Sequence, residues 1–314
     1  MAADPITPTT GRTRLATTGA RRATEAALMS ANGRDRLIGM VFQALLLLGL
    51  SVALFMLAAL LVWSLVEGAP RLGPELITNG PSTVRPAEAG FRTAILGTLL
   101  VVGGVVAVIV PVGVGAAIYL EEYANRDRWL NRLIELNIQN LAGVPSIVFG
   151  ILGLAFIVRG PLNLGFVAAA GSLTLALLVL PTVIIAAREA IRAVPPSIRE
   201  GSLALGATRW QTIRRQTLPA AMPGVLTGVI LAVARATGEA APLLLVGAVT
   251  FVTFNPNFFE GGYSTLPVQI FNYSNRAQDE FRVLAMAGVI VMLGLVLLMN
   301  SFAVWLRNRF ERSW

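Results

Sequence analysis

Six long stretches of mostly apolar residues constrain the fold of this chain more than any other feature. A helix needs roughly 20 apolar residues to cross the hydrocarbon core of a bilayer. Glycine and proline inside such stretches are tolerated, because neighbouring helices satisfy the freed backbone groups. The stretches lie at residues 37–66, 93–120, 136–158, 161–187, 219–250 and 283–306. We therefore predict an all-α integral membrane protein with six transmembrane helices.

The composition excludes several classes of chemistry. Only 13% of the residues are charged, whereas soluble domains carry about 25%. The chain has no cysteine, so disulfides, thiolate metal sites and cysteine nucleophiles are excluded. It also has no histidine, the usual general base and metal ligand. An intramembrane enzyme would lack a plausible base and nucleophile, and we expect no catalytic residues and no metal site.

The distribution of arginine predicts the orientation in the membrane. All 25 basic residues are arginine, and the formal net charge is +8. In a soluble chain that charge would suggest nucleic acid; here the arginines gather in alternate loops, which indicates topology and no nucleic-acid partner. Most of them lie before residue 37, after the second and fourth apolar stretches, and at the C-terminus. Because cytoplasmic loops are enriched in arginine, both termini are predicted to be cytoplasmic.

The domain organisation is simple. We expect residues 1–36 to be a disordered cytoplasmic tail, with contact to anionic lipid headgroups as an alternative role. A signal peptide is not expected, because the following apolar run is longer than a signal's h-region of about 7–15 residues. Residues 37–314 form one transmembrane domain. Aromatics in the outer loop 251–282 are expected to pack against the bundle, and a docking surface for an external partner stays open as an alternative.

The loop at 188–218 predicts a short amphipathic helix. Ser197 is expected to cap it with Glu200 three residues on, a capping-box pattern. The helix should continue through Leu205 and end at Gly206, a suitable C-terminal residue. Such a helix lies on lipid, packs on its own protein, or inserts into a groove of a partner, and amphipathicity alone does not choose among these.

Arg235 and Glu239 are a charged pair inside the fifth apolar stretch. They are four residues apart, so we expect them to share one helix face. Charges at this depth usually face the bundle interior or a water-filled cavity. They form either a structural ion pair or a substrate site, where arginine suits a tetrahedral oxyanion and Thr237 adds a hydroxyl. Pro242 is expected to interrupt the helix just after the pair.

Four segments carry a family resemblance. REGSLALGATRWQTIRRQTLP resembles the loop motif of ABC importer permeases, with Gly201, Ser202 and Gln216 departing from it. AIYLEEYA, NLAGVPSIVFGILGLAF and ARATGEAAPLL, together with that loop, resemble the phosphate-specific permeases of the PstA type over about residues 93–306. The resemblance implies that the loop helix docks into an ATPase and couples its closure to the membrane gate. That role falls on Glu200, Ala204, Leu205 and Gly206.

The resemblance also implies the function, the fold and the partners. The fold would be that of a type I ABC importer permease with a cytoplasmic coupling helix, in the bacterial plasma membrane. The partners would be a PstC-type permease, a PstB-type ATPase dimer and an external phosphate-binding protein of the PstS type. ATP and magnesium would be bound by the ATPase, since this chain has no Gly-rich, Lys-containing nucleotide loop. A permease for another oxyanion, such as molybdate or sulfate, and an ion channel are the alternatives.

Overall fold

The computed structural model describes residues 33–125, 127–248 and 251–310. Within these ranges the chain is helical, with connecting turns and an isolated bridge between Ala248 and Tyr263. Residues 1–32 of the expected tail lie outside the described residues, and α2 begins at Gly33 rather than after residue 36. The chain divides into two compact units, Met1–Trp63 and Ser64–Trp314.

Helix α2 (Gly33–Gly68) corresponds to the first predicted span. Its large apolar side chains are exposed all along the helix, Leu45 and Phe55 among them. A helix that is apolar on every side belongs in lipid or against other apolar helices. With 36 residues it is long enough to cross a bilayer.

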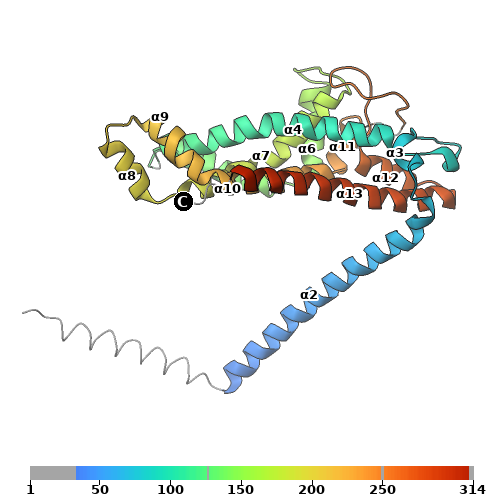
Figure 1. Cartoon of the computed structure of the whole chain (residues 1–314), viewed down its shortest axis with the longest axis horizontal. Coiled ribbons are helices and arrows are strands. Elements are labelled where there is room, and N and C mark those ends of the chain that lie inside the picture. Colours follow the sequence, from blue (N-terminus) through green and yellow to red (C-terminus); the bar gives the residue numbers. More distant parts are fainter. Residues whose placement is uncertain (1–32, 126, 249–250, 311–314) are drawn as a thin grey trace, which may run out of the picture. The chain divides into compact units, whose positions relative to one another are not determined.

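Four long helices form the bundle of the second unit (Figure 1). They are α4 (Arg92–Ile118), α7 (Ala168–Arg192), α10 (Leu218–Gly238) and α13 (Asp279–Phe310). Helix α7 is the most buried of the long helices and packs against both α4 and α10. Val105, Leu175, Val179 and Ala232 are fully buried in the core that these three helices share. The outer surfaces of α4 and α13 stay apolar and exposed, as lipid-facing or partner-facing helices require.

One end of the bundle, which we call the α12 end, is closed by short elements (Figure 1). These are η1 (Ala69–Arg71), α3 (Glu75–Thr78), η2 (Pro86–Glu88) and α12 (Leu266–Ser274). The rings of Phe91, Tyr273 and Phe281 pack together there, and burial raises the pKa of the Tyr273 phenol. Phe254 and Phe259 are exposed instead. The aromatics of the expected outer loop therefore divide between packing and a free surface.

The opposite end, which we call the α8 end, carries a helical loop (Figure 1). Helix α4 ends there in the π-helical turn η3 (Tyr119–Tyr123). After α7 the chain forms α8 (Pro196–Ala204), α9 (Arg209–Thr212) and the π-helical turn η5 (Ile213–Thr217), which leads into α10. A small apolar cluster that includes Ala187, Ile191 and Val225 holds this end together.

The third predicted span is bent. The expected helix over 136–158 is instead α5 (Trp129–Ala142) and α6 (Ser146–Leu152), the latter continuing as η4 (Gly153–Val158), with 109° between the two parts. Pro145 has no N–H to donate and disfavours the α conformation in the residue before it, so the helix stops. The described residues contain five helices long enough to span, or six if this bent pair is one span.

The fifth predicted span is interrupted earlier than expected. Helix α10 ends at Gly238, and a separate short helix, α11 (Ala241–Leu245), follows. The expected interruption is present, but it lies at Gly238 and not at Pro242. The fourth span also begins later than residue 161, at Ala168, because residues 159–167 form turns that include Asn163 at φ 43°.

Candidate functional site

The short helix α11, which follows α10, meets the bent third span inside the bundle. Glu239 lies in extended backbone just past the helix, and Pro242 stands in the first turn of α11. Gly150 of α6 packs directly on this break, because a Cβ added there would lie 2.7 Å from the Cα of Pro242. Two interrupted apolar segments therefore touch each other. Broken helices that meet at membrane depth are a common way to build a transport site.

Arg235 and Glu239 lie at this break. The Nε of Arg235 is 3.6 Å from an Oε of Glu239, which is ion-pair distance but too long for a strong hydrogen bond. The Arg235 side chain is 44% exposed and that of Glu239 19%. Glu239 is the capping residue at the end of α10, and its side chain lies beside that of Arg235 four residues earlier, so the expected pairing on one helix face is confirmed. Pro242 belongs to the next helix and does not itself end α10.

Within this pair, Arg235 is the member that could bind an anion. Arg235 is in the last turn of α10, where a cation complements the helix dipole. Its guanidinium offers several donors in one plane, a geometry that matches phosphate-like oxygens. Glu239 lies beside the guanidinium and is largely shielded from solvent. The pair therefore presents an accessible, oriented guanidinium with a carboxylate beside it.

Thr237 does not join this pair. Its side chain is buried, and its hydroxyl donates a 2.8 Å hydrogen bond to the carbonyl of Val233. It packs near Thr98 and Thr265 within the bundle. Helical residues two apart do not face each other. The spacing in the sequence was therefore already enough to separate Thr237 from Arg235 and Glu239. The role of Thr237 as a substrate donor stays a prediction, and the described geometry gives it no support.

The helix α8 begins and ends by recognisable rules. Pro195 occupies the N-cap and no side chain caps the helix, so the expected capping box of Ser197 and Glu200 is wrong. Gly206 has φ +85°, the N–H of Gly206 donates to the carbonyl of Leu203, and the N–H of Ala207 donates to that of Ser202. These two bonds form a Schellman motif. The predicted stop at Gly206 is confirmed.

The expected coupling residues lie on a free surface. Glu200, Ala204, Leu205 and Gly206 are all exposed, with Leu205 91% exposed at the tip of the loop. Beside them runs a groove of about 430 Å³, lined by residues that include Ile198 and Leu205. An apolar tip beside a groove is a surface typical of a protein contact.

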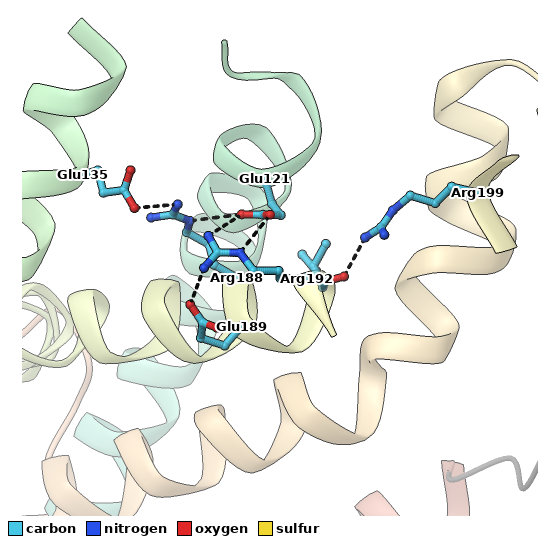
Figure 2. Close-up of polar contacts among 7 residues, drawn as sticks. Glu121, Glu135, Arg188, Glu189, Arg192 and Arg199 are labelled. Atoms are coloured by element: carbon cyan, nitrogen blue, oxygen red, sulfur yellow. Dashed lines mark hydrogen bonds and ion pairs between the residues drawn. The ribbon is translucent and has the colours of Figure 1, made fainter. Parts of the chain in front are cut away.

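A network of charged residues at the α8 end was missed in the sequence (Figure 2). Glu121 of η3 accepts hydrogen bonds of 3.1 and 3.0 Å from Arg192 and lies 3.7 Å from the Nε of Arg188. Arg188 also donates to Glu135 of α5 at 2.9 Å, and Arg192 donates to Glu189. Arg188 and Glu121 are both buried. The network ties α4, α5 and α7 together.

Arg199 of α8 extends these contacts to the loop. Its Nε donates to an Oε of Glu122 at 3.0 Å, with both side chains largely buried. Its two terminal nitrogens donate to the carbonyls of Val194 and Ile191 at 2.8 and 2.6 Å. Two adjacent acids at the end of an apolar span, opposite an arginine-rich loop, were the signal that could have predicted these pairs.

The next residue, Tyr123, contacts α9. The guanidinium carbon of Arg209 lies 5.0 Å from the centre of the Tyr123 ring, a cation–π geometry. The start of α9 is fixed by a capping box in which Thr208 and Gln211 bond each other's backbone N–H. Arg209 therefore extends from a defined helix start.

The sequence is similar to known transport proteins over most of its length. A family model described as "Binding-protein-dependent transport system inner membrane component" matches residues 109–312. The chain is 35% identical over 264 residues to the phosphate transport system permease protein PstA of Haemophilus influenzae, covering 82% of this chain and 91% of the relative. It is 32% identical over 263 residues to the probable ABC transporter permease protein YqgI of Bacillus subtilis, covering 80% and 88%.

A solved structure shares the fold. It is a bacterial alginate ABC transporter in complex with an alginate pentasaccharide-bound periplasmic protein, matched with a TM-score of 0.64 over 89% of this chain and 98% of that one. The sequence identity is 15%, so this likeness concerns the fold alone.

Proposed function

Because this chain belongs to the inner-membrane components of binding-protein-dependent ABC importers, we propose that it is the phosphate-selective permease of such an importer. A protein of this family is a multi-pass inner-membrane permease of an ABC transporter complex with an ATPase and a binding protein. It is not catalytic, and its ATPase partner binds ATP. The predicted all-α permease fold is confirmed.

One observation carries the choice of an oxyanion: the accessible guanidinium of Arg235, held beside Glu239 at the break after α10. A permanent cation at membrane depth has to face a cavity or a partner. The name of the H. influenzae relative supports phosphate among oxyanions. Glu239 supplies a chemical reason, because a carboxylate accepts a hydrogen bond from the O–H of hydrogen phosphate, whereas sulfate has no O–H to donate near neutral pH.

The proposed assembly follows. A second permease of the PstC type completes the pathway, a PstB-type ATPase dimer binds below, and a PstS-type phosphate-binding protein delivers the ion outside. Both termini and the α8 end face the cytoplasm. Glu200, Ala204, Leu205 and Gly206, all exposed, contact the ATPase. ATP binding closes the ATPase dimer, moves α8 and turns the cavity outward.

The test is uptake of radiolabelled phosphate by the reconstituted complex with competing sulfate and molybdate. We expect phosphate alone to compete strongly and uptake to require ATP. Arg235→Ala should abolish uptake while the complex still assembles. Equal competition by molybdate or sulfate would make it a permease for another oxyanion, and current without the ATPase would make it a channel.

A further inference from the structure

We propose that Glu121, Glu122 and Tyr123, which we call the EEY clasp, transmit the movement of α8 to helix α4. The inference rests on the proposed coupling role of α8. That role does not say which transmembrane helix moves when α8 moves. The contacts of η3 point to α4, because η3 is the direct continuation of that helix.

Three consecutive residues contact three different elements. Glu121 binds Arg188 and Arg192 of α7, Glu122 binds Arg199 of α8, and Tyr123 stacks on Arg209 of α9. Consecutive residues of a helical turn leave it in different directions, and η3 is a π-helical turn, a distortion frequent at functional sites. One turn therefore contacts the end of α7 and the two loop helices α8 and α9.

The Glu122–Arg199 pair is the rigid part of the clasp. Arg199 has three acceptors within 3.0 Å, namely Glu122 and the carbonyls of Ile191 and Val194 at the end of α7. Glu122 is buried at 9% exposure. Separating such a pair would leave a buried charge without a partner, which is strongly unfavourable. When α8 is displaced, Arg199 should draw both α7 and the end of α4 with it.

Backbone packing links α8 to α4 only indirectly, through α7 or through η5 and α10. Helix α8 packs on α9 and η5, which precede α10, whereas α4 packs on α7 and α10 along the bundle. The side chains of the clasp bridge the loop to α4. A displacement of α4 then reaches α10, the helix that carries Arg235. The clasp residues act as positioning residues, since they lie at the α8 end and Arg235 lies near the other end of α10.

The experiment measures the ATP hydrolysed per phosphate taken up by the full reconstituted complex, with radiolabelled inorganic phosphate. Glu122→Gln keeps the shape but removes the charge, and Tyr123→Leu removes the ring. We expect both to keep ATP hydrolysis and to raise this ratio about three- to tenfold, the range in which coupling residues act. Tyr123→Phe keeps the ring, and Glu189→Gln alters an exposed partner of Arg192 outside the clasp; both should leave the ratio unchanged.

A cross-link separates this proposal from the role of α8. The chain has no cysteine, so Ala204→Cys supplies a single thiol for cross-linking to the ATPase. A cross-link with an unchanged ratio in Glu122→Gln and Tyr123→Leu would overturn the clasp and leave α8 as the coupling helix. A parallel fall of hydrolysis and uptake at a constant ratio would also overturn it. Absence of the cross-link in every nucleotide state would instead reject the coupling role of α8.

Discussion

Glu239 is the residue whose chemistry most directly tests selectivity. It is largely shielded, and its carboxylate lies 3.6 Å from the guanidinium of Arg235. Glu239→Gln keeps the size but replaces a carboxylate that only accepts hydrogen bonds with an amide that also donates. We expect phosphate uptake to fall about tenfold or more, the effect of losing one charged hydrogen bond. Sulfate should become a better competitor, because the amide no longer repels an ion without a proton.

The matched control is Glu260→Gln in the exposed outer loop. It should change neither phosphate uptake nor its inhibition by sulfate. The measurement is inhibition of phosphate uptake by sulfate. If Glu239→Gln transports with unaltered preference, Glu239 only pairs with Arg235 and takes no part in selection.

Two glycines of the loop give opposite predictions. Gly206 ends α8 at φ +85°, where any side chain is strained. Gly201 lies inside α8. An added Cβ would meet nothing within 4 Å at either position. Gly206→Ala should destabilise the loop by about 1 kcal/mol, since the left-handed conformation disfavours a Cβ. Gly201→Ala should stabilise α8 by about 0.5–1 kcal/mol, because it removes freedom from the unfolded chain.

Trypsin cleavage at Arg199 and Arg209 measures both changes. Cleavage of a transiently opened segment follows the population of the open form. We expect about fivefold faster cleavage for Gly206→Ala and slower cleavage for Gly201→Ala. Changes of the same sign in the two variants would contradict the helix end described for α8.

At the scale of elements, the contact between α6 and α11 holds the site together. Gly150 leaves no space for a side chain beside Pro242. Gly150→Ala should force the two interrupted segments apart and destabilise the fold by about 1–3 kcal/mol. The unfolding temperature of the purified protein should fall by several degrees, and phosphate uptake should fall with it. Gly115→Ala in α4, with open space around it, is the control and should raise or preserve the temperature.

The elements also show what hydropathy predicts and what it leaves open. Long apolar runs predicted α2, α4, α7, α10 and α13, because the bilayer demands length and apolarity whatever the packing. The break at Gly238 depends on which segments meet, and the break at Pro145 depends on the backbone of proline. Hydropathy reports neither of these causes. Arg235 and Glu239 stood out because charge is rare in such runs. The partners of Glu121 and Glu122 were missed, because they come from helices distant in sequence.

At the scale of the whole molecule, the bent pair α5–α6 decides the topology. Helices α4 and α7 both end at the α8 end, so the segment that contains the bent pair has to return to the other end of the bundle between them. If that return crosses the bilayer, the chain has six spans and its termini share a side. The arginine distribution favours six. The chain has no cysteine, so single thiols report their side without background.

Four variants complete this test. Leu205→Cys and Val84→Cys mark the two ends of the bundle and are both exposed. Thr18→Cys and Ser313→Cys mark the termini, which lie outside the described residues. In intact cells a membrane-impermeant maleimide should label Val84→Cys alone, and permeabilised cells should label all four. Labelling of one terminus before permeabilisation would contradict the six spans. Labelling of Leu205→Cys in intact cells would place α8 outside, where no ATPase could reach it.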